Sequence, residues 1–216
     1  MFIGHYGPAF AAKPLARRIP LWLLFIAVQW MDVCWSVLVM LHVEKLRIIP
    51  GFTEGSPLDL YYMPFTHGLL GALALAVLFG GIASSFFSAP RTKVFFVLAT
   101  AAFSHWLFDL VVHVPDLPLW KDTMKVGLGL WRWAWISVPL ELVVMAGGAW
   151  IYARFVPAKK GGDTWLWLFV AAMAALELYN QFAPPPQDTA IMAAMALVAY
   201  GFLALLAALV DRTRTA

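Results

Sequence analysis

Residues 104–116, with the sequence SHWLFDLVVHVPD, bring together the side chains that are best able to do chemistry. On a helix, His105, Asp109 and His113 follow one another at intervals of four residues, so their side chains lie along one face. Two imidazoles and a carboxylate at this spacing can bind one cation or relay one proton. Their neighbours are apolar, and an ionisable group in hydrocarbon costs roughly 3 kcal/mol unless it is paired, hydrated or bound to a metal. We therefore expect the function to depend on this face.

The composition is that of an integral membrane protein. Hydrophobic residues make up 62% of the 216 residues and charged residues only 12%, whereas a soluble domain carries about 25% charged residues. This predicts an all-α fold, a polytopic transmembrane helix bundle that forms a single domain over residues 1–216. The single cysteine, Cys34, excludes an internal disulfide and a metal site built from several thiolates. The basic residues are spread over short loops, so the net charge of +3 indicates no nucleic-acid partner.

The apolar runs predict about six membrane spans. Pro64 is suited to the first turn of the second span, and Pro115 ends the third. The residues before the first span are too few to cross a membrane and are predicted to form a short interfacial or re-entrant segment. No strand alternation is visible. The predicted spans cover about residues 21–43, 64–88, 94–114, 133–156, 164–182 and 189–210.

The distribution of basic residues predicts an orientation. With the N-terminus inside, ten basic residues fall on the inner side and five on the outer side, which favours cytoplasmic termini at both ends. The inner residues are Lys13, Arg17, Arg18, Arg91, Lys93, Arg154, Lys159, Lys160, Arg212 and Arg214, and the outer ones are Lys45, Arg47, Lys121, Lys125 and Arg132.

The spacing of His105 and Asp109 allows both to bind one metal ion from a single helix. A structural alternative is a His–Asp hydrogen bond that joins two helices. His113 continues the same face toward the outer surface, where it either acts in proton transfer or lies at a solvated loop end. We take the first interpretation and treat His113 and Asp109 as candidate catalytic residues.

Three further residues are candidates for the same site. Asp32, in the sequence QWMDVCW, lies deep in the first span, where it either serves a metal or a proton or is a protonated acid bonded to a neighbouring helix. His67 can meet the third span because Gly71 on the same face lets another helix approach closely. His5 can reach a central site only if residues 1–12 fold inward.

These residues resemble the motifs of a family of small bacterial inner-membrane proteins described as metal-dependent hydrolases, which is distantly similar to zinc-dependent phospholipases C. The family pattern has an N-terminal His, an Asp in the first span, a Thr-His pair that opens a later helix, and a helix with His-xxx-Asp. The corresponding residues here occur in the same order, over residues 1–118. They are His5 in FIGHYG, Asp32 in QWMD, Thr66 and His67 in PFTHG, and His105 and Asp109 in SHWLFD.

The resemblance implies a metal centre and a location in the bacterial inner membrane. Gln29 and Trp30 stand where the family has Pro-Asp, and Tyr62 and Met63 stand where it has His-Arg, so one acid and one histidine are absent. This leaves ligands for one metal ion rather than two. The implied ligands of a Zn²⁺ or another divalent metal are His5, Asp32, His67, His105 and Asp109.

The implied activity is hydrolysis of an amphiphilic, phospholipid-like substrate by a metal-activated water, with whichever of Asp32 and Asp109 is not a ligand as general base. Membrane lipids are the expected partners. Two alternatives from other classes remain. One is a proton-coupled transporter that uses Asp32, Asp109, Glu141 and Glu177, and the other is a non-catalytic membrane subunit.

Overall fold

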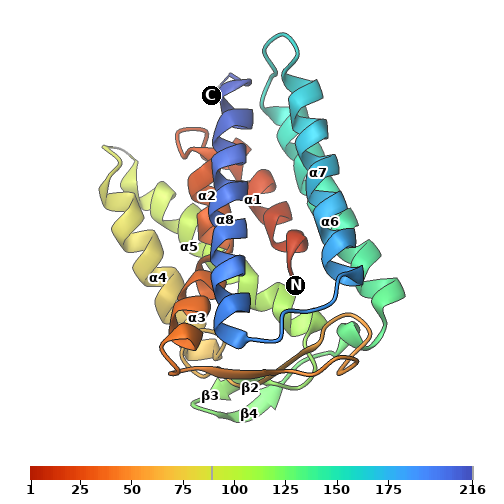
Figure 1. The fold of residues 1–216 in the computed structure, drawn as a ribbon. Coiled ribbons are helices and arrows are strands. Elements are labelled where there is room, and N and C mark those ends of the chain that lie inside the picture. Colours follow the sequence, from red (N-terminus) through yellow and green to blue (C-terminus); the bar gives the residue numbers. More distant parts are fainter. Residues whose placement is uncertain (89, 216) are drawn as a thin grey trace.

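Helices make up most of the chain, as the apolar runs predict. A computed structural model describes residues 1–88 and 90–215 (Figure 1). The last four helices of the chain begin and end within three residues of their predicted bounds. The helices are α1 Tyr6–Ala12, α2 Leu21–Val28, α3 Trp30–Met40, α4 Leu69–Ser85, α5 Arg91–Val112, α6 Ala134–Phe155, α7 Gly162–Phe182 and α8 Thr189–Arg212, with short 3₁₀ turns at Ile3–His5, Lys13–Leu15 and Leu130–Arg132.

The prediction of six spans is wrong in number. Within residues 1–88 and 90–215, three helices, α5, α6 and α8, are long and apolar enough to cross a membrane. A fourth span results if α2 and α3, which are bent by 54° at Gln29, are counted together. At 17 residues, α4 is about 25 Å long, which is shorter than a hydrocarbon core of about 30 Å. The helix α7 is long enough to cross a membrane but is not among these candidates, because the polar residues at its ends lower its mean hydropathy.

Two short hairpins correct the expectation of an all-α fold. Strands β1 (Lys45–Ile48) and β2 (Leu58–Tyr62) pair antiparallel, as do β3 (Leu117–Trp120) and β4 (Thr123–Val126). Both hairpins lie at the same end of the helix bundle (Figure 1). In β1, Leu46 is buried between two exposed basic residues, but an alternation over four residues is too short to stand out in the sequence.

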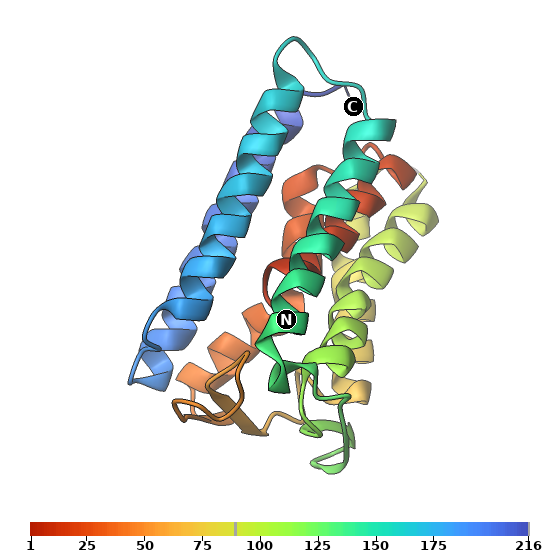
Figure 2. The same ribbon diagram turned by 90° about the vertical axis from the view of Figure 1, so that its right-hand side faces the viewer.

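The N-terminal segment folds into the interior of the helix bundle. Ile3, Tyr6 and Phe10 are fully buried in the main apolar core of the bundle. The segment packs mainly on α6, and α7 and α8 lie on one side of the bundle while α4 and α5 lie on the other (Figure 2). The short helix α1 therefore acts as an inner element that the longer helices surround.

Glycines make the close contact between α1 and α6. A Cβ atom built on Gly148 would lie 2.1 Å from the backbone oxygen of Gly7, which is a distance that no real Cβ contact shows. The neighbouring Gly147 has no heavy atom within 4 Å of such a Cβ. The two adjacent glycines therefore differ sharply, and only Gly148 is required by packing.

We expect Gly148→Ala to displace α1 and to lower the free energy of unfolding by about 2 kcal/mol, in the range typical of overpacked cores. Thermal unfolding of the purified protein in detergent would measure this loss. Gly147→Ala is the matched control and should be neutral or slightly stabilising, because alanine favours helix over glycine. Equal effects of the two substitutions would contradict the packing described here.

Candidate metal centre

The five predicted ligands lie together, with Asp109 at their centre. Asp109 Oδ2 is 3.0 Å from His105 Nε2 and 3.6 Å from His67 Nε2, while Oδ1 is 3.1 Å from His5 Nε2. Asp32 Oδ1 lies 3.3 Å from His67 Nε2 and 3.4 Å from His105 Nε2. The residues come from the N-terminal segment, α3, the turn before α4, and α5. Two overlapping groups, one with His5 and one with Asp32, have the geometry of metal ligands.

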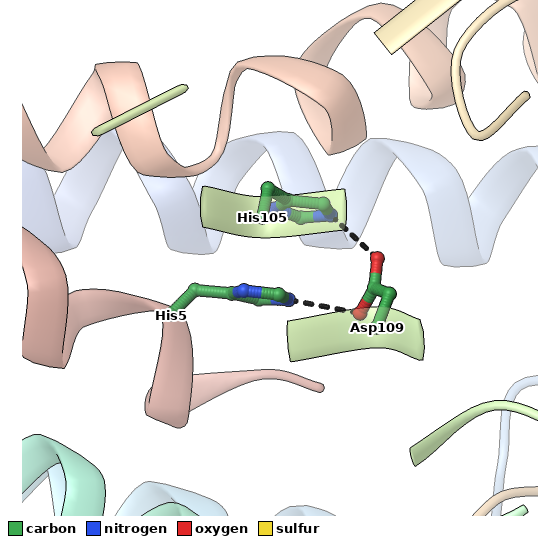
Figure 3. A group of neighbouring side chains, drawn as sticks. All are labelled: His5, His105 and Asp109. Carbon is green, nitrogen blue, oxygen red and sulfur yellow. Dashed lines mark ion pairs between the residues drawn. The ribbon is translucent and has the colours of Figure 1, made fainter. Parts of the chain in front are cut away.

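The two oxygens of Asp109 face two stacked imidazoles. The rings of His5 and His105 are nearly parallel, at an interplanar angle of 10°, with centroids 3.7 Å apart (Figure 3). Each ring directs its Nε2 to a different oxygen of the carboxylate (Figure 3). Among the described residues, Asp109 Oδ2, His105 Nε2 and both ring nitrogens of His5 are buried without a hydrogen bond. Such a set of unsatisfied polar atoms is costly unless something else binds there.

The break between α2 and α3 fixes the orientation of His105. Nδ1 of His105 lies 2.7 Å from the backbone oxygen of Val28, the last residue of α2. A carbonyl oxygen can only accept, so Nδ1 carries the hydrogen. The carbonyls at the end of a helix lack partners within it, and the bend at Gln29 leaves this one available. His105 thus directs Nε2 toward the two aspartates.

A buried carboxylate fixes His67 in the same way. Glu44, which is 1% exposed, accepts hydrogen bonds from the backbone of Phe65 and Thr66 and, at 2.5 Å, from Thr66 Oγ1. Because the hydroxyl proton of Thr66 goes to Glu44, its oxygen accepts from His67 Nδ1 at 2.8 Å. The lone pair of His67 Nε2 is therefore free to bind a metal. Outer carboxylates of this kind commonly orient metal-binding histidines.

Glu44 was missed by the sequence analysis because a carboxylate at the end of a span resembles a solvated loop residue. The prediction that Pro64 lies in the first turn of a helix is wrong. The helix α4 begins at Leu69, so Pro64 lies in the turn that precedes it. The backbone N–H groups of this turn are the ones that Glu44 binds.

His113 lies directly after α5 and is buried, at 2% exposure, rather than at a solvated loop end. Its Nδ1 is 2.9 Å from Asp116 Oδ1, and its Nε2 is 3.5 Å from Asp109 Oδ1. Burial alone would lower the pKa of His113, but the charges of Asp116 and Asp109 outweigh burial and raise it. His113 can therefore hold a proton beside the cluster.

Two further contacts support the site from other helices. The hydroxyl of Tyr200 on α8 donates to Asp32 Oδ2 at 2.9 Å. Glu141 on α6 accepts from the backbone N–H groups of Phe2 and Gly4, and so holds the segment that carries His5. No pattern in the sequence marked Tyr200, because a tyrosine in an apolar helix is usually only a packing residue.

The site opens into a cavity of about 640 Å³ at the hairpin end of the bundle. Asp32, His67, Asp109 and His113 line this cavity, whereas His5 and His105 are not part of its lining. Apolar side chains such as Leu58, Leu60 and Met192 form another part of the wall. The volume is in the range of small-molecule sites. A bound molecule can therefore reach the cluster from the side of the two aspartates.

We predict that Nδ1 is protonated in both His67 and His105, and that Glu44→Gln alters only His67. A glutamine amide at residue 44 can donate to Thr66 Oγ1, which frees the hydroxyl proton of Thr66 to bind His67 Nδ1. Side-chain ¹⁵N NMR of metal-free protein would report the tautomers. His105 is the internal control, because its partner is a backbone carbonyl. An unchanged His67 signal in Glu44→Gln would refute the link through Thr66.

Comparisons of the chain with protein-family models, with curated proteins and with solved structures found no match. The resemblance described in the sequence analysis thus rests on the quoted motifs, and the function is argued below from the geometry of the site.

Proposed function

We propose that this protein is a membrane-embedded, metal-dependent hydrolase that holds one divalent cation, with zinc as the best fit. The proposal depends on four candidate ligand atoms, Asp32 Oδ1, His67 Nε2, His105 Nε2 and Asp109 Oδ2, of which a catalytic zinc uses three and leaves the fourth position to water. Four of the six separations between them are 3.3, 3.4, 3.6 and 3.0 Å. A tetrahedral zinc site with bonds of about 2.05 Å has ligand atoms about 3.3 Å apart. Two imidazoles and two carboxylates are also ligands that suit zinc.

The unsatisfied atoms of the cluster support this assignment. His105 Nε2 and Asp109 Oδ2 face each other at 3.0 Å as a buried ion pair without an aligned hydrogen bond, and a cation bound by both atoms would satisfy them. His5 contacts the opposite oxygen of Asp109, so it either adds a fifth ligand or holds the carboxylate in place. Because Nδ1 of His67 and of His105 is already occupied, each imidazole has one nitrogen left for the metal.

The residues on the cavity side supply the remaining functions. A divalent cation at this position would lower the pKa of a water molecule and polarise a phosphoryl or acyl oxygen. Three of the four candidate ligands would hold the metal and leave one position for this water, and whichever of Asp32 and Asp109 is not a ligand can accept its proton from the cavity side. His113, with Nδ1 fixed by Asp116, can deliver a proton to a leaving group from Nε2.

The substrate that fits is amphiphilic and phospholipid-like. The cavity joins a polar region around the aspartates to apolar walls at the hairpin end. Membrane lipids can approach an enzyme that is built from apolar helices. The excess of basic residues at the end opposite the hairpins favours cytoplasmic termini, and the resemblance to the hydrolase family implies a location in the bacterial inner membrane.

Elemental analysis of the purified protein tests the proposal. We expect one equivalent of divalent metal in the wild type and at least a tenfold loss of metal affinity in His67→Ala and His105→Ala, since each removes a ligand. His42→Asn is the matched control. His42 is an exposed histidine outside the site with a φ of 58°, a conformation that asparagine tolerates.

Wild-type protein without stoichiometric metal, and with the same stability in a strong chelator, would refute the hydrolase proposal. Metal retained in His105→Ala would show that the ligands are assigned wrongly even if the protein binds a metal.

We expect His113→Gln to keep its metal but to lower kcat for hydrolysis of phospholipids in mixed micelles by about 10²- to 10⁴-fold, as loss of a proton-transfer group usually does. Product release and metal content are measured on the same samples. Loss of metal in this variant would instead make His113 a ligand.

A second function, proton-coupled transport, is favoured by one observation. Asp32, Asp109, Glu141 and Glu177 all line the same cavity, as a proton path would require. A transporter of this kind needs the carboxylates but no resident metal. The elemental analysis therefore decides between the two functions.

A further inference from the structure

A second cavity, of about 540 Å³, lies at the end of the bundle opposite the hairpins. It is bounded by the start of α2, the end of α8 and the segments beside them. This end also contains the loops before α2 and between α6 and α7 (Figure 1). The lining residues are Pro20, Trp22, Lys159, Ala208, Asp211, Arg212, Arg214 and Thr215.

Among the described residues of this lining Asp211 is the one acid, and other residues already satisfy it. Asp211 Oδ2 accepts from Lys13 Nζ at 2.8 Å and from the backbone N–H of Leu21 at 3.0 Å. Its Oδ1 accepts from the hydroxyl of Tyr152 at 2.7 Å. Asp211 therefore does not neutralise the basic side chains that line the cavity.

Three basic residues remain in the lining. Arg214 is 2% exposed and binds the backbone oxygen of Val156 and the carboxylate of Asp163, but its Nε has no hydrogen bond with any described residue. Lys159 Nζ donates to the backbone oxygen of Arg212 at 2.9 Å and has two further hydrogens to donate. Arg212 also lines the cavity and is an exposed residue. The cavity thus offers the ammonium of Lys159 and the guanidinium of Arg212 as donors to an anion, beside the buried Arg214.

An apolar strip leads along α8 to this basic cavity. Leu205 and Leu209 are 58% and 48% exposed, and they share one helix face with Ala208 and Arg212 at the spacing i, i+3, i+4 and i+7. Trp22 on α2 lines the same cavity and is 43% exposed. Tryptophan favours the membrane interface. The surface therefore changes from apolar to basic within two helical turns, as the surface of a bound lipid molecule changes from acyl chain to headgroup.

We propose that this cavity binds the phosphate-bearing headgroup of an anionic phospholipid, with an acyl chain along Leu205 and Leu209. Guanidinium and ammonium groups bind phosphate through charge-assisted hydrogen bonds. Basic pockets between transmembrane helices at the cytoplasmic side are typical headgroup sites. The site is separate from the metal centre and does not depend on its function.

Binding to delipidated full-length protein in detergent tests the proposal, with native mass spectrometry as the readout and phosphatidylglycerol as the probe. We expect the double variant Lys159→Gln/Arg212→Gln to bind phosphatidylglycerol at least tenfold more weakly than the wild type. Lys45→Gln is the matched control, because Lys45 is an exposed lysine at the hairpin end. Both substituted residues are exposed, and unchanged thermal unfolding of the apo variants shows that the fold is retained.

Two further binding measurements on the wild-type protein distinguish a lipid headgroup from free phosphate. Phosphatidylcholine, which carries no net charge, should bind the wild type at least tenfold more weakly than phosphatidylglycerol, and rising salt should weaken only the latter. Equal binding of both lipids, or no effect of the double variant, would overturn the proposal. Inorganic phosphate that binds as tightly as the lipid would assign the cavity to free phosphate and overturn the lipid assignment.

Discussion

The carboxylate of Asp109 is the group to which the rest of the structure must adapt. It is 1% exposed inside an apolar bundle, where an uncompensated charge would cost several kcal/mol. Its Oδ1 accepts a hydrogen bond from the N-terminal ammonium of Met1 at 2.9 Å and faces His5, while Oδ2 faces His67 and His105. The inward-folded N-terminal segment, the bend between α2 and α3 and the turn before α4 each bring one neighbour of this carboxylate into place.

The sequence predicted the candidate ligands of the site, but not the residues that hold these ligands in position. His105 and Asp109 were visible because their spacing of four residues puts them on one helix face and because charged groups are rare in apolar runs. Glu44 was not visible, because its importance depends on a contact with Thr66 across 22 residues, which no local pattern records. Tyr200 reaches Asp32 across 168 residues and was invisible for the same reason.

The fold was predicted correctly where apolar runs are long and uninterrupted, as in α5 to α8. It was predicted incorrectly where hydropathy does not determine backbone geometry. The run over residues 21–43 reads as one span, yet it bends by 54° at Gln29, where the backbone leaves the helical conformation (φ −103°, ψ 8°). That bend exposes the Val28 carbonyl to His105. The error in the fold prediction and the fixed orientation of a ligand therefore have the same cause.

The contact between α1 and α6 has a consequence for biosynthesis. Phe2 is bound by Glu141, 139 residues further along the chain, and Gly7 needs Gly148 as its neighbour. A ribosome that adds about 10 residues per second takes on the order of ten seconds to make that distance. During this interval the apolar residues 2–10 lack their final partner. They must be shielded by other contacts until α6 is made, so this segment reaches its final position well after its own synthesis.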